Sequence, residues 1–316
     1  MIEQRLQLLI DARLAAWCDA LPHTGLYEPM RYLLGLPAKR VRPALVLLGC
    51  ELFGGRAEDA LDEAIGLELF HNFTLVHDDI MDAAPLRRGR PTVHERSGVN
   101  AAILSGDALL VKAYPLMARR PDVLALFGRT ALQVCEGQQA DMEFERRDDV
   151  RLAEYDAMIR LKTAVLLGCA LRTGALVANA PAGDAALIGD FGEHLGLAFQ
   201  LRDDLLDAFG DAATMGKQQG GDLRAGKKTW LMIRALERAA EERWGLLREE
   251  LAKPPAARDV ARMRAAIEQL GVRAEAEAEV VRHDGAARAA LAAIAVPEPR
   301  KAPLHALAAA LLDRAH

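Results

Sequence analysis

The chain has 316 residues, of which 51% are hydrophobic, enough apolar surface to fill a large core. Its formal net charge is −5, so no global positive field attracts nucleic acid, and nucleic-acid binding is not expected. Aromatic residues make up only 5%, while alanine and leucine, two strong helix formers, recur throughout, which favours helices over strands.

Apolar residues recur at three- and four-residue spacing along almost the whole chain, which is the period of amphipathic helices. Proline and glycine separate these stretches, and no alternation of period two is long enough to indicate a sheet. The pattern predicts an all-α fold, a single large bundle of about a dozen helices in one domain spanning residues 1–316. Helices are expected at about residues 2–20, 42–52, 57–83, 99–119, 122–146, 151–168, 170–178, 184–208, 229–240, 241–251, 257–270, 272–295 and 302–314.

The first residues carry acidic side chains and no long apolar run, so they do not look like a signal peptide. No stretch of about 18 uncharged apolar residues is present, so an integral membrane segment is not expected and the default location is the cytoplasm. The cysteines are far apart and form no C-x-x-C pair, which predicts free, mostly buried thiols in a reducing compartment. They are Cys18, Cys50, Cys135 and Cys169.

Three aspartates close the predicted helix that ends before Pro85, and they are Asp78, Asp79 and Asp82. Asp78 and Asp82 are four residues apart, so their carboxylates share one helical face. Like charges at this spacing repel, and the carbonyl end of a helix already carries partial negative charge. Each of these effects costs about 0.3–1 kcal/mol, so the cluster is unfavourable unless something compensates it.

The same pattern recurs at Asp203, Asp204 and Asp207, with Gly210 ending the helix just beyond. Either cluster alone could be a solvated acidic helix end. Two clusters with the same spacing and position favour a site for a hard divalent cation such as Mg²⁺, which prefers oxygen ligands. An EF-hand is excluded because its loop motif is absent. Zinc is not favoured, because His77 lacks a second His or Cys at ligand spacing.

Arginine and lysine clusters accompany the aspartates. Metal ions on one side of a diphosphate and Arg or Lys donors on the other form a stable binding site, although each basic residue alone could be a surface charge or an ion-pair partner. No Walker A run and no G-x-G-x-x-G is present, so a nucleotide kinase or an ATPase is disfavoured. The basic residues concerned are Lys39, Arg40, Arg42, Arg87, Arg88, Arg90, Lys162, Lys217, Lys227 and Lys228.

From about Lys39 to Trp230 the sequence resembles the trans-isoprenyl diphosphate synthases, with the motifs in family order. The basic G-K-R-x-R-P motif departs only at its first position, which is Ala38. The resemblance implies the isoprenoid synthase fold, in which helices surround a central apolar cavity. The other matches are His71, D-D-x-x-D at 78–82, Arg87-Arg88-Gly89, G-Q-x-x-D at 137–141, Lys162-Thr163, Phe199-Gln200 before D-D-L-L-D, Gly216-Lys217 and D-L-x-x-G-K at 222–227.

The resemblance also implies roles for the matching residues. Mg²⁺, for which Mn²⁺ can substitute, would be bound as roughly three ions per site. The metal residues would be Asp78, Asp82 and Asp203, supported by Asp79, Asp204 and Asp207. The allylic diphosphate would be bound by Arg87, Lys162, Lys217 and Lys227. Isopentenyl diphosphate would be bound by Lys39, Arg42, His71 and Arg88, while Thr163 and Gln200 would lie beside the allylic carbon.

Three residues near the first cluster bear on product length: Phe70, Phe73 and Thr74. In the family that this chain resembles, the product grows along this helix. A bulky ring at Phe73, five residues before Asp78, is similar to enzymes that stop at short products, and D-D-x-x-D lacks the two-residue insertion of many bacterial short-chain members. We expect twenty-carbon geranylgeranyl diphosphate or fifteen-carbon farnesyl diphosphate. The alternative is that Phe73 is ordinary core packing.

The expected function is therefore that of a prenyltransferase, which joins isopentenyl diphosphate to dimethylallyl, geranyl or farnesyl diphosphate. A terpene cyclase on the same scaffold would usually carry an N-S-E-type triad in place of D-D-L-L-D, and would lack the set Lys39, Arg42 and His71. A non-catalytic partner subunit would tend to have lost aspartates from one motif, whereas both are retained. The resemblance further implies a homodimer.

Overall fold

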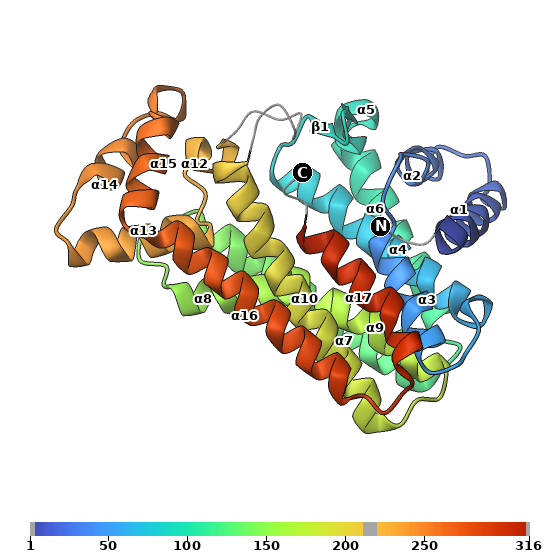
Figure 1. Cartoon of the computed structure of the whole chain (residues 1–316). Helices are drawn as coiled ribbons and strands as arrows, with labels where there is room; N and C mark the ends of the chain where they lie inside the picture. Colours follow the sequence, from blue (N-terminus) through green and yellow to red (C-terminus); the bar gives the residue numbers. More distant parts are fainter. Residues whose placement is uncertain (1–3, 211–219, 314–316) are drawn as a thin grey trace. The chain divides into compact units, whose positions relative to one another are not determined.

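The computed structural model describes residues 4–210 and 220–313, and in these ranges the chain is almost entirely helical (Figure 1). The elements are α1 (Gln4–Asp19), α2 (Glu28–Leu34), α3 (Val41–Leu52), η1 (Ala57–Ala60), α4 (Leu61–Met81), β1 (Leu86–Arg87), β2 (Arg90–Pro91), α5 (Val93–Ser97), α6 (Val99–Met117), α7 (Pro121–Phe144), α8 (Leu152–Ile159), η2 (Arg160–Ala164), α9 (Val165–Val177), α10 (Ala182–Phe209), α12 (Gly221–Ala225), α13 (Trp230–Glu241), α14 (Leu246–Leu251), η3 (Pro255–Ala257), α15 (Val260–Gln269), α16 (Val272–Ala293) and α17 (Glu298–Leu312).

The structure confirms the all-α prediction, and the long helices lie where the apolar periodicity placed them. Three short helices, α2, α5 and α12, were not predicted, because five to seven residues are too few for a helical period to appear. The predicted break near residue 169 is absent, and the helix is instead distorted one turn earlier by η2, which is a π-helical turn. A short antiparallel hairpin, β1–β2, was also missed; it pairs Leu86 with Pro91 and Arg87 with Arg90.

The contacts within the chain define two compact units. The first unit comprises residues 1–129, 169–189 and 295–304. The second unit comprises residues 130–168, 190–294 and 305–316. The first aspartate cluster (Asp78, Asp79 and Asp82) belongs to the first unit, and the second aspartate cluster (Asp203, Asp204 and Asp207) belongs to the second.

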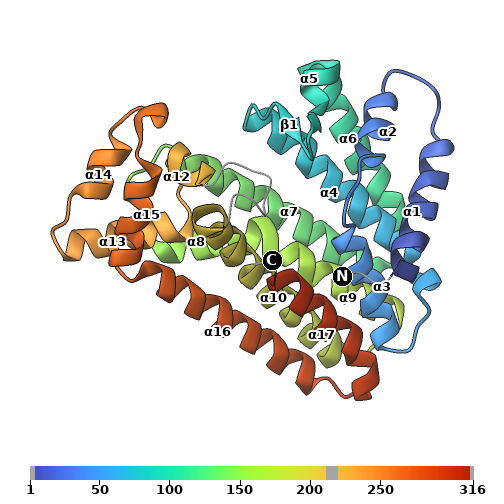
Figure 2. The ribbon, with the colours of Figure 1, turned by 45° about the horizontal axis from the view of Figure 1, so that its top comes forward.

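The core of the first unit is built around α4, which packs against α3 and α6 (Figures 1 and 2). Phe70 of α4 is fully buried, and its ring meets that of Phe127 edge-on at 5.2 Å between centroids. Phe73, one turn later, is 9% exposed and lies 5.6 Å from Phe70 and 4.7 Å from the ring of His77. Tyr114 of α6 extends the cluster by stacking edge-on against Phe127. These rings pack the length of α4 that leads to its aspartates.

The end of α4 positions the first aspartate cluster. Asp62 and Glu63 lie in the first turn of the helix, where negative charge is favourable. Asp82 is the residue that caps the other end, and Ala83 then adopts a φ of 47°, a left-handed conformation that a helix cannot continue. Pro85 follows directly, so the chain leaves the helix and enters the β1–β2 hairpin. The aspartates therefore occupy the last turn, as the sequence predicted.

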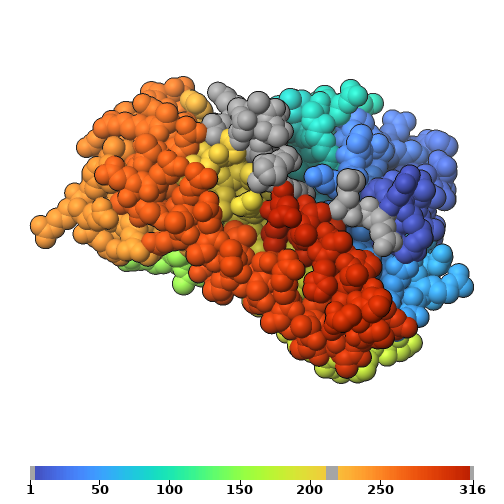
Figure 3. Space-filling model, viewed as in Figure 1, coloured from blue at the N-terminus to red at the C-terminus, as the bar shows by residue number. Residues whose placement is uncertain are grey.

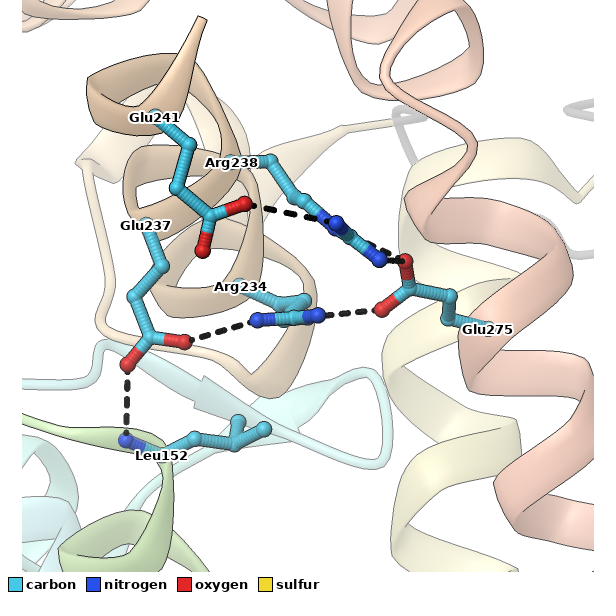
Figure 4. A network of polar contacts seen from close by, with 6 residues as sticks. All are labelled: Leu152, Arg234, Glu237, Arg238, Glu241 and Glu275. Carbon is cyan, nitrogen blue, oxygen red and sulfur yellow. Dashed lines mark hydrogen bonds and ion pairs between the residues drawn. The ribbon is translucent and has the colours of Figure 1, made fainter.

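In the second unit, α13 is joined to α16 and to the start of α8 by a network of charged groups (Figure 4). Arg234 donates to Glu275 at 2.6 Å, and Arg238 donates to the other oxygen of the same carboxylate at 2.9 Å. Glu237 accepts from Arg234 at 3.2 Å and from the backbone N–H of Leu152 at 3.3 Å. Because Arg234, Glu237 and Glu275 each make contacts with two partners, the network fixes α13 more firmly than isolated surface pairs would.

A pair of histidines joins α10 to α16, which lies at the surface of the second unit (Figure 3). His194 Nδ1 and His283 Nδ1 are 3.0 Å apart, and Arg282 Nη2 lies 2.9 Å from His283 Nε2. Arginine can only donate, so Nε2 of His283 accepts and its proton sits on Nδ1, from where it is donated to His194. Burial, followed by the positive charge of Arg282, lowers the pKa of His283 to about 4.

This pair makes stability depend on pH in a defined window. An unfolded histidine has a pKa of 6.5, so between pH 6.5 and about 4 the unfolded chain binds a proton that the folded chain excludes. The free energy of unfolding should fall as the pH is lowered through this window, by about 3 kcal/mol from this group. His283→Gln keeps a donor and an acceptor but cannot titrate, so its unfolding midpoints should decline less steeply with pH.

Urea unfolding at a series of pH values measures this difference. His23→Gln is the matched control, since His23 is exposed and its replacement should leave the slope unchanged. Equal slopes for the wild type and His283→Gln would show that the histidine pair does not set the acid sensitivity.

The four cysteines are free, as predicted, but only two of them, Cys50 and Cys169, are buried. Cys18 is partly buried and Cys135 is exposed. Among the helices that the structure describes, none combines the length and the apolar character needed to cross a membrane.

Candidate active site

The first aspartate cluster contains one side chain that is turned into the protein. Asp79 is 2% exposed, and its carboxylate accepts three hydrogen bonds from Arg87, two from Nε at 2.8 and 2.9 Å and one from Nη2 at 2.7 Å. Asp82, at the cap, is exposed, and Asp78 is partly buried. The carboxylates therefore differ in environment, although the sequence presents them as one motif.

The β1–β2 hairpin brings the arginines back toward the aspartates. Arg88 and Gly89 occupy its turn with φ values of 53° and 72°. Glycine adopts such angles without strain, which allows the two-residue turn. Arg87 precedes the turn and reaches Asp79, while Arg88 is exposed at its tip. The contacts of Arg87 engage Nε and Nη2, so Nη1 is the nitrogen left to meet an anion.

Arg42 and His71 form a second polar group of the first unit. Arg42 Nη1 lies 3.0 Å from His71 Nε2, and this ring nitrogen must be the acceptor because arginine only donates. Burial, followed by the charges of Arg42 and Arg88, lowers the pKa of His71 well below 6.5. The imidazole is therefore neutral and carries its proton on Nδ1. Burial also lowers the pKa of Arg42 to about 10, which leaves it charged at neutral pH.

Arg40 and Glu68 anchor the start of α3, which carries Arg42 and follows the exposed Lys39, a function that the sequence did not reveal. Arg40 Nη1 donates to Glu68 at 2.6 Å, and Nη2 donates to the backbone oxygen of Leu34. Both side chains are almost fully buried. The sequence does contain an indication of this pair. Glu68 is an acidic residue inside an apolar helix, and a buried charge requires a partner of opposite charge. Lys39 itself is exposed.

In the second aspartate cluster, Asp204 is the residue turned inward. It is 5% exposed and accepts from Tyr155 Oη at 2.8 Å, from Gln200 Nε2 at 3.0 Å and from the backbone N–H of Trp230 at 3.4 Å. Burial raises the pKa of Asp204 to about 6, against the lowering effect of its hydrogen bonds. Asp203, the preceding residue, is partly buried.

Asp207 binds the segment that begins at Gly220. Its carboxylate accepts from the backbone N–H of Asp222 at 2.9 Å, and its backbone oxygen accepts from Gly220 at 2.7 Å. With Asp204 bound to Trp230, two of the three aspartates hold the segment that contains Lys227, which is exposed. Lys217, a predicted diphosphate ligand, lies outside the described residues.

Lys162 and Thr163 lie in the π-helical turn η2, within the second unit. Such turns interrupt regular helices and occur frequently at functional sites. Lys162 Nζ donates to Asp141 of α7 at 2.5 Å. One turn earlier on α7, a Cβ atom added to Gly137 would lie 2.3 Å from the backbone nitrogen of Lys162. The glycine therefore allows α7 to approach the π-helical turn, and Asp141 then orients the ammonium group.

Gly137→Ala should accordingly damage both activity and stability. The new methyl group must displace the backbone of Lys162, and a shift of about 1 Å in a site can cost roughly 100-fold in kcat/KM. Overpacking of this kind also lowers the free energy of unfolding by about 1–3 kcal/mol. Steady-state kinetics and urea unfolding measure the two effects.

Gly128→Ala is the matched control on the same helix. No atom lies within 4 Å of a Cβ placed at Gly128, so alanine should raise stability by about 0.5–1 kcal/mol and leave the kinetics unchanged. Wild-type kinetics in Gly137→Ala would show that the approach of α7 to Lys162 is not needed.

The sequence matches a known protein family. The family profile described as polyprenyl synthetase matches residues 23–270, most of the chain. The chain belongs to the polyprenyl synthetase family. It is a prenyltransferase with the all-α fold of that family.

Similar proteins include isoprenyl diphosphate synthases. The short chain isoprenyl diphosphate synthase of Methanothermobacter thermautotrophicus is 41% identical over 230 residues, covering 71% of this chain and 70% of its own. The geranylgeranyl diphosphate synthase of Sulfolobus acidocaldarius is 40% identical over 243 residues, 74% of each chain. A crystal structure of a geranylgeranyl pyrophosphate synthase has a TM-score of 0.92 at 42% identity and covers 98% of both chains. None of these three is a terpene cyclase, and that alternative has no support.

The two aspartate clusters offer ligand atoms that suit a hard divalent cation. Both clusters offer carboxylate oxygens and neither includes a thiol, which matches the preference of Mg²⁺. Within residues 4–210 and 220–313, no three His, Cys, Asp or Glu side chains are grouped to hold a metal ion. One reason is that Asp79 and Asp204 are turned toward protein donors. Phosphate oxygens and water would have to complete the coordination, which is usual for Mg²⁺.

Proposed function

We propose that this enzyme condenses isopentenyl diphosphate with dimethylallyl, geranyl or farnesyl diphosphate in a Mg²⁺-dependent reaction. The observation that carries the proposal is that α4 and α10 end in the same arrangement of three aspartates, of which one is buried. In each unit, an inward aspartate is bound by protein donors and other aspartates of the same motif lie next to it. A basic side chain acts on the inward aspartate in both, Arg87 on Asp79 and Lys227 on Asp204. We propose further that the chain acts as one domain and that both clusters are needed for the reaction.

In this proposal Asp78, Asp82 and Asp203 hold the metal ions, and Asp79, Asp204 and Asp207 support them. Bound Mg²⁺ would supply positive charge to the diphosphate as the carbon–oxygen bond of the allylic substrate breaks. The chain's own cations act on the same leaving group, since Arg and Lys donors stabilise developing negative charge in a site without water. The residues proposed to bind the allylic diphosphate are Arg87, Lys162, Lys217 and Lys227.

Isopentenyl diphosphate is proposed to bind to the polar group of the first unit, which contains Lys39, Arg42, His71 and Arg88. The neutral His71 supports this role, because its Nδ1–H can donate to a phosphate oxygen while Nε2 remains bound to Arg42. Thr163 and Gln200 are proposed to lie beside the allylic carbon. The proton lost in the condensation would pass to the released diphosphate, and apolar side chains would keep water from the allylic cation.

We propose geranylgeranyl diphosphate as the product, with farnesyl diphosphate as the next candidate. The buried ring of Phe73 supports a short product, because it lies on the helix that leads to the first cluster and is backed by Phe70. Thr74, the neighbouring residue, is smaller and partly buried. Relatives at about 40% identity are named geranylgeranyl diphosphate synthase.

A cytoplasmic homodimer is the proposed form of the enzyme. One face of α6 carries large apolar side chains that are exposed in the single chain, which a soluble monomer rarely groups in this way. They are Val99 at 48%, Ile103 at 39%, Leu104 at 59%, Val111 at 66% and Tyr114 at 40%. Sedimentation equilibrium distinguishes a dimer from a monomer.

A product assay tests the proposed function. The purified protein is incubated with Mg²⁺, isopentenyl diphosphate and each allylic primer, and the products are sized by chromatography. Prenyl diphosphates should form only when both substrates and Mg²⁺ are present. A hydrocarbon released from farnesyl diphosphate alone would indicate a cyclase, and activation of another synthase by a protein that is itself inactive would indicate a partner subunit.

A further inference from the structure

We propose that Tyr155 is a positioning residue that holds the second aspartate cluster in its working orientation by binding Asp204. The inference rests on the proposed function, in which that cluster supports the metal–diphosphate complex. Tyr155 belongs to none of the sequence motifs discussed above, and it lies 49 residues before Asp204 in the chain.

The contact between the two side chains is short and buried. Tyr155 is 3% exposed and Asp204 is 5% exposed, and the phenol oxygen lies 2.8 Å from Asp204 Oδ2. The phenol must donate, because a carboxylate offers only acceptors. A hydrogen bond to a buried carboxylate is stronger than one between neutral groups, and its loss leaves a charged oxygen without a partner.

Asp204 links the parts of the second unit that carry the proposed ligands. Gln200 Nε2, one turn earlier on α10, donates to Asp204 Oδ1, and the N–H of Trp230, the first residue of α13, approaches Oδ2 at 3.4 Å. Tyr155 lies on α8, directly before the π-helical turn that contains Lys162. One carboxylate thus joins α8, α10 and α13, and it holds in place the part of α10 that also carries Asp203.

The hydroxyl of Tyr155 binds Asp204, while its ring is packed inside the second unit. The Tyr155 ring borders a cavity of about 220 Å³, which Gln200 also lines together with apolar side chains from α8 and α10. The apolar lining includes Ile159, Leu197 and Leu201. Packing of the ring does not decide where the phenol O–H points, so the bond to Asp204 fixes the direction of that hydroxyl.

Tyr155→Phe removes this bond without changing the shape of the ring. Isothermal titration with inorganic diphosphate and Mg²⁺, in the absence of turnover, should show binding about tenfold weaker than in the wild type, because a buried charged acceptor loses its donor. The value of kcat should also fall about tenfold. The KM for isopentenyl diphosphate should stay within about twofold, since that substrate is proposed to bind in the first unit.

Tyr27→Phe is the matched control, because Tyr27 belongs to the first unit and to no proposed site; it should match the wild type in every measurement. A double-mutant cycle with Asp204→Asn tests whether Tyr155→Phe weakens diphosphate binding through Asp204. If Tyr155 acts through Asp204, the double variant should bind diphosphate no more than about twofold more weakly than Asp204→Asn alone.

Three results would overturn the inference: wild-type diphosphate binding in Tyr155→Phe, a change only in thermal stability, or additive losses in the cycle. Failure of the wild type itself to bind Mg²⁺ and diphosphate would instead reject the proposed function on which the inference rests.

Discussion

Asp78→Asn should lower kcat by a factor on the order of 1,000 while leaving the fold intact. The substitution keeps the shape of the side chain but removes a negative charge from the last turn of α4, where like charges and the helix end already oppose it. The midpoint of thermal unfolding should therefore stay close to that of the wild type as catalysis fails. A metal ligand contributes several kcal/mol to stabilising the leaving group, which corresponds to the expected loss of rate.

Steady-state kinetics and thermal unfolding of the same preparation measure both effects. Asp19→Asn is the matched control, since Asp19 is an exposed aspartate at the end of α1, and its charge should not matter for the reaction. A kcat within about tenfold of the wild type for Asp78→Asn would contradict a metal-binding role for the first cluster.

Phe73→Ala should convert the enzyme to longer products, by one or more five-carbon units. The ring of Phe73 is nearly buried, lies five residues before Asp78 and is flanked by Phe70 and His77 at 5.6 and 4.7 Å. Truncation removes the side chain that is proposed to form the floor of the product pocket, and the space becomes available to the growing chain. If Phe73 only packs the core, Phe73→Ala should lower the free energy of unfolding by about 3–5 kcal/mol. If the space left by the ring accepts product, bound product should restore part of this loss.

Product length is read by chromatography after removal of the diphosphate. Phe53→Ala, at the cap of α3, truncates a phenylalanine of the same unit that is on a different helix from the first aspartate cluster, and it should leave product length unchanged. An unchanged product distribution in Phe73→Ala, together with a loss of stability, would show that Phe73 is a core residue and that the floor lies elsewhere.

The long helices could be predicted from sequence because their apolar residues repeat over several turns. Apolar periodicity located α4, α7, α10 and α16 closely, whereas α2 and α5 are too short to show a period. The π-helical turn at Lys162 was missed for a different reason. It depends on contact with α7 at Gly137, and a contact between separate helices leaves no local pattern.

Candidate site residues could be chosen from the sequence where charged residues are close together in the chain. The two aspartate clusters and the arginines after the first one were found in this way. The sequence could not show that Asp79 and Asp204 are turned inward, because each stands beside another aspartate. Only their contacts with Arg87 and Tyr155, which are formed in the folded chain, distinguish them from their neighbours. Glu68 was detectable as a charge within an apolar helix, whereas Tyr155 offered no signal, since one tyrosine in an amphipathic helix is ordinary.

Ligand-induced stabilisation tests most directly whether the two aspartate clusters act on one diphosphate. Thermal unfolding of the wild type, Asp78→Asn and Asp203→Asn is recorded with Mg²⁺ alone and with Mg²⁺ and saturating inorganic diphosphate. The wild type should gain about 2.7 kcal/mol at a ligand concentration 100 times the Kd, and each single variant should lose most of that gain. Full stabilisation of either variant would contradict the account, because one cluster would then bind diphosphate without the other.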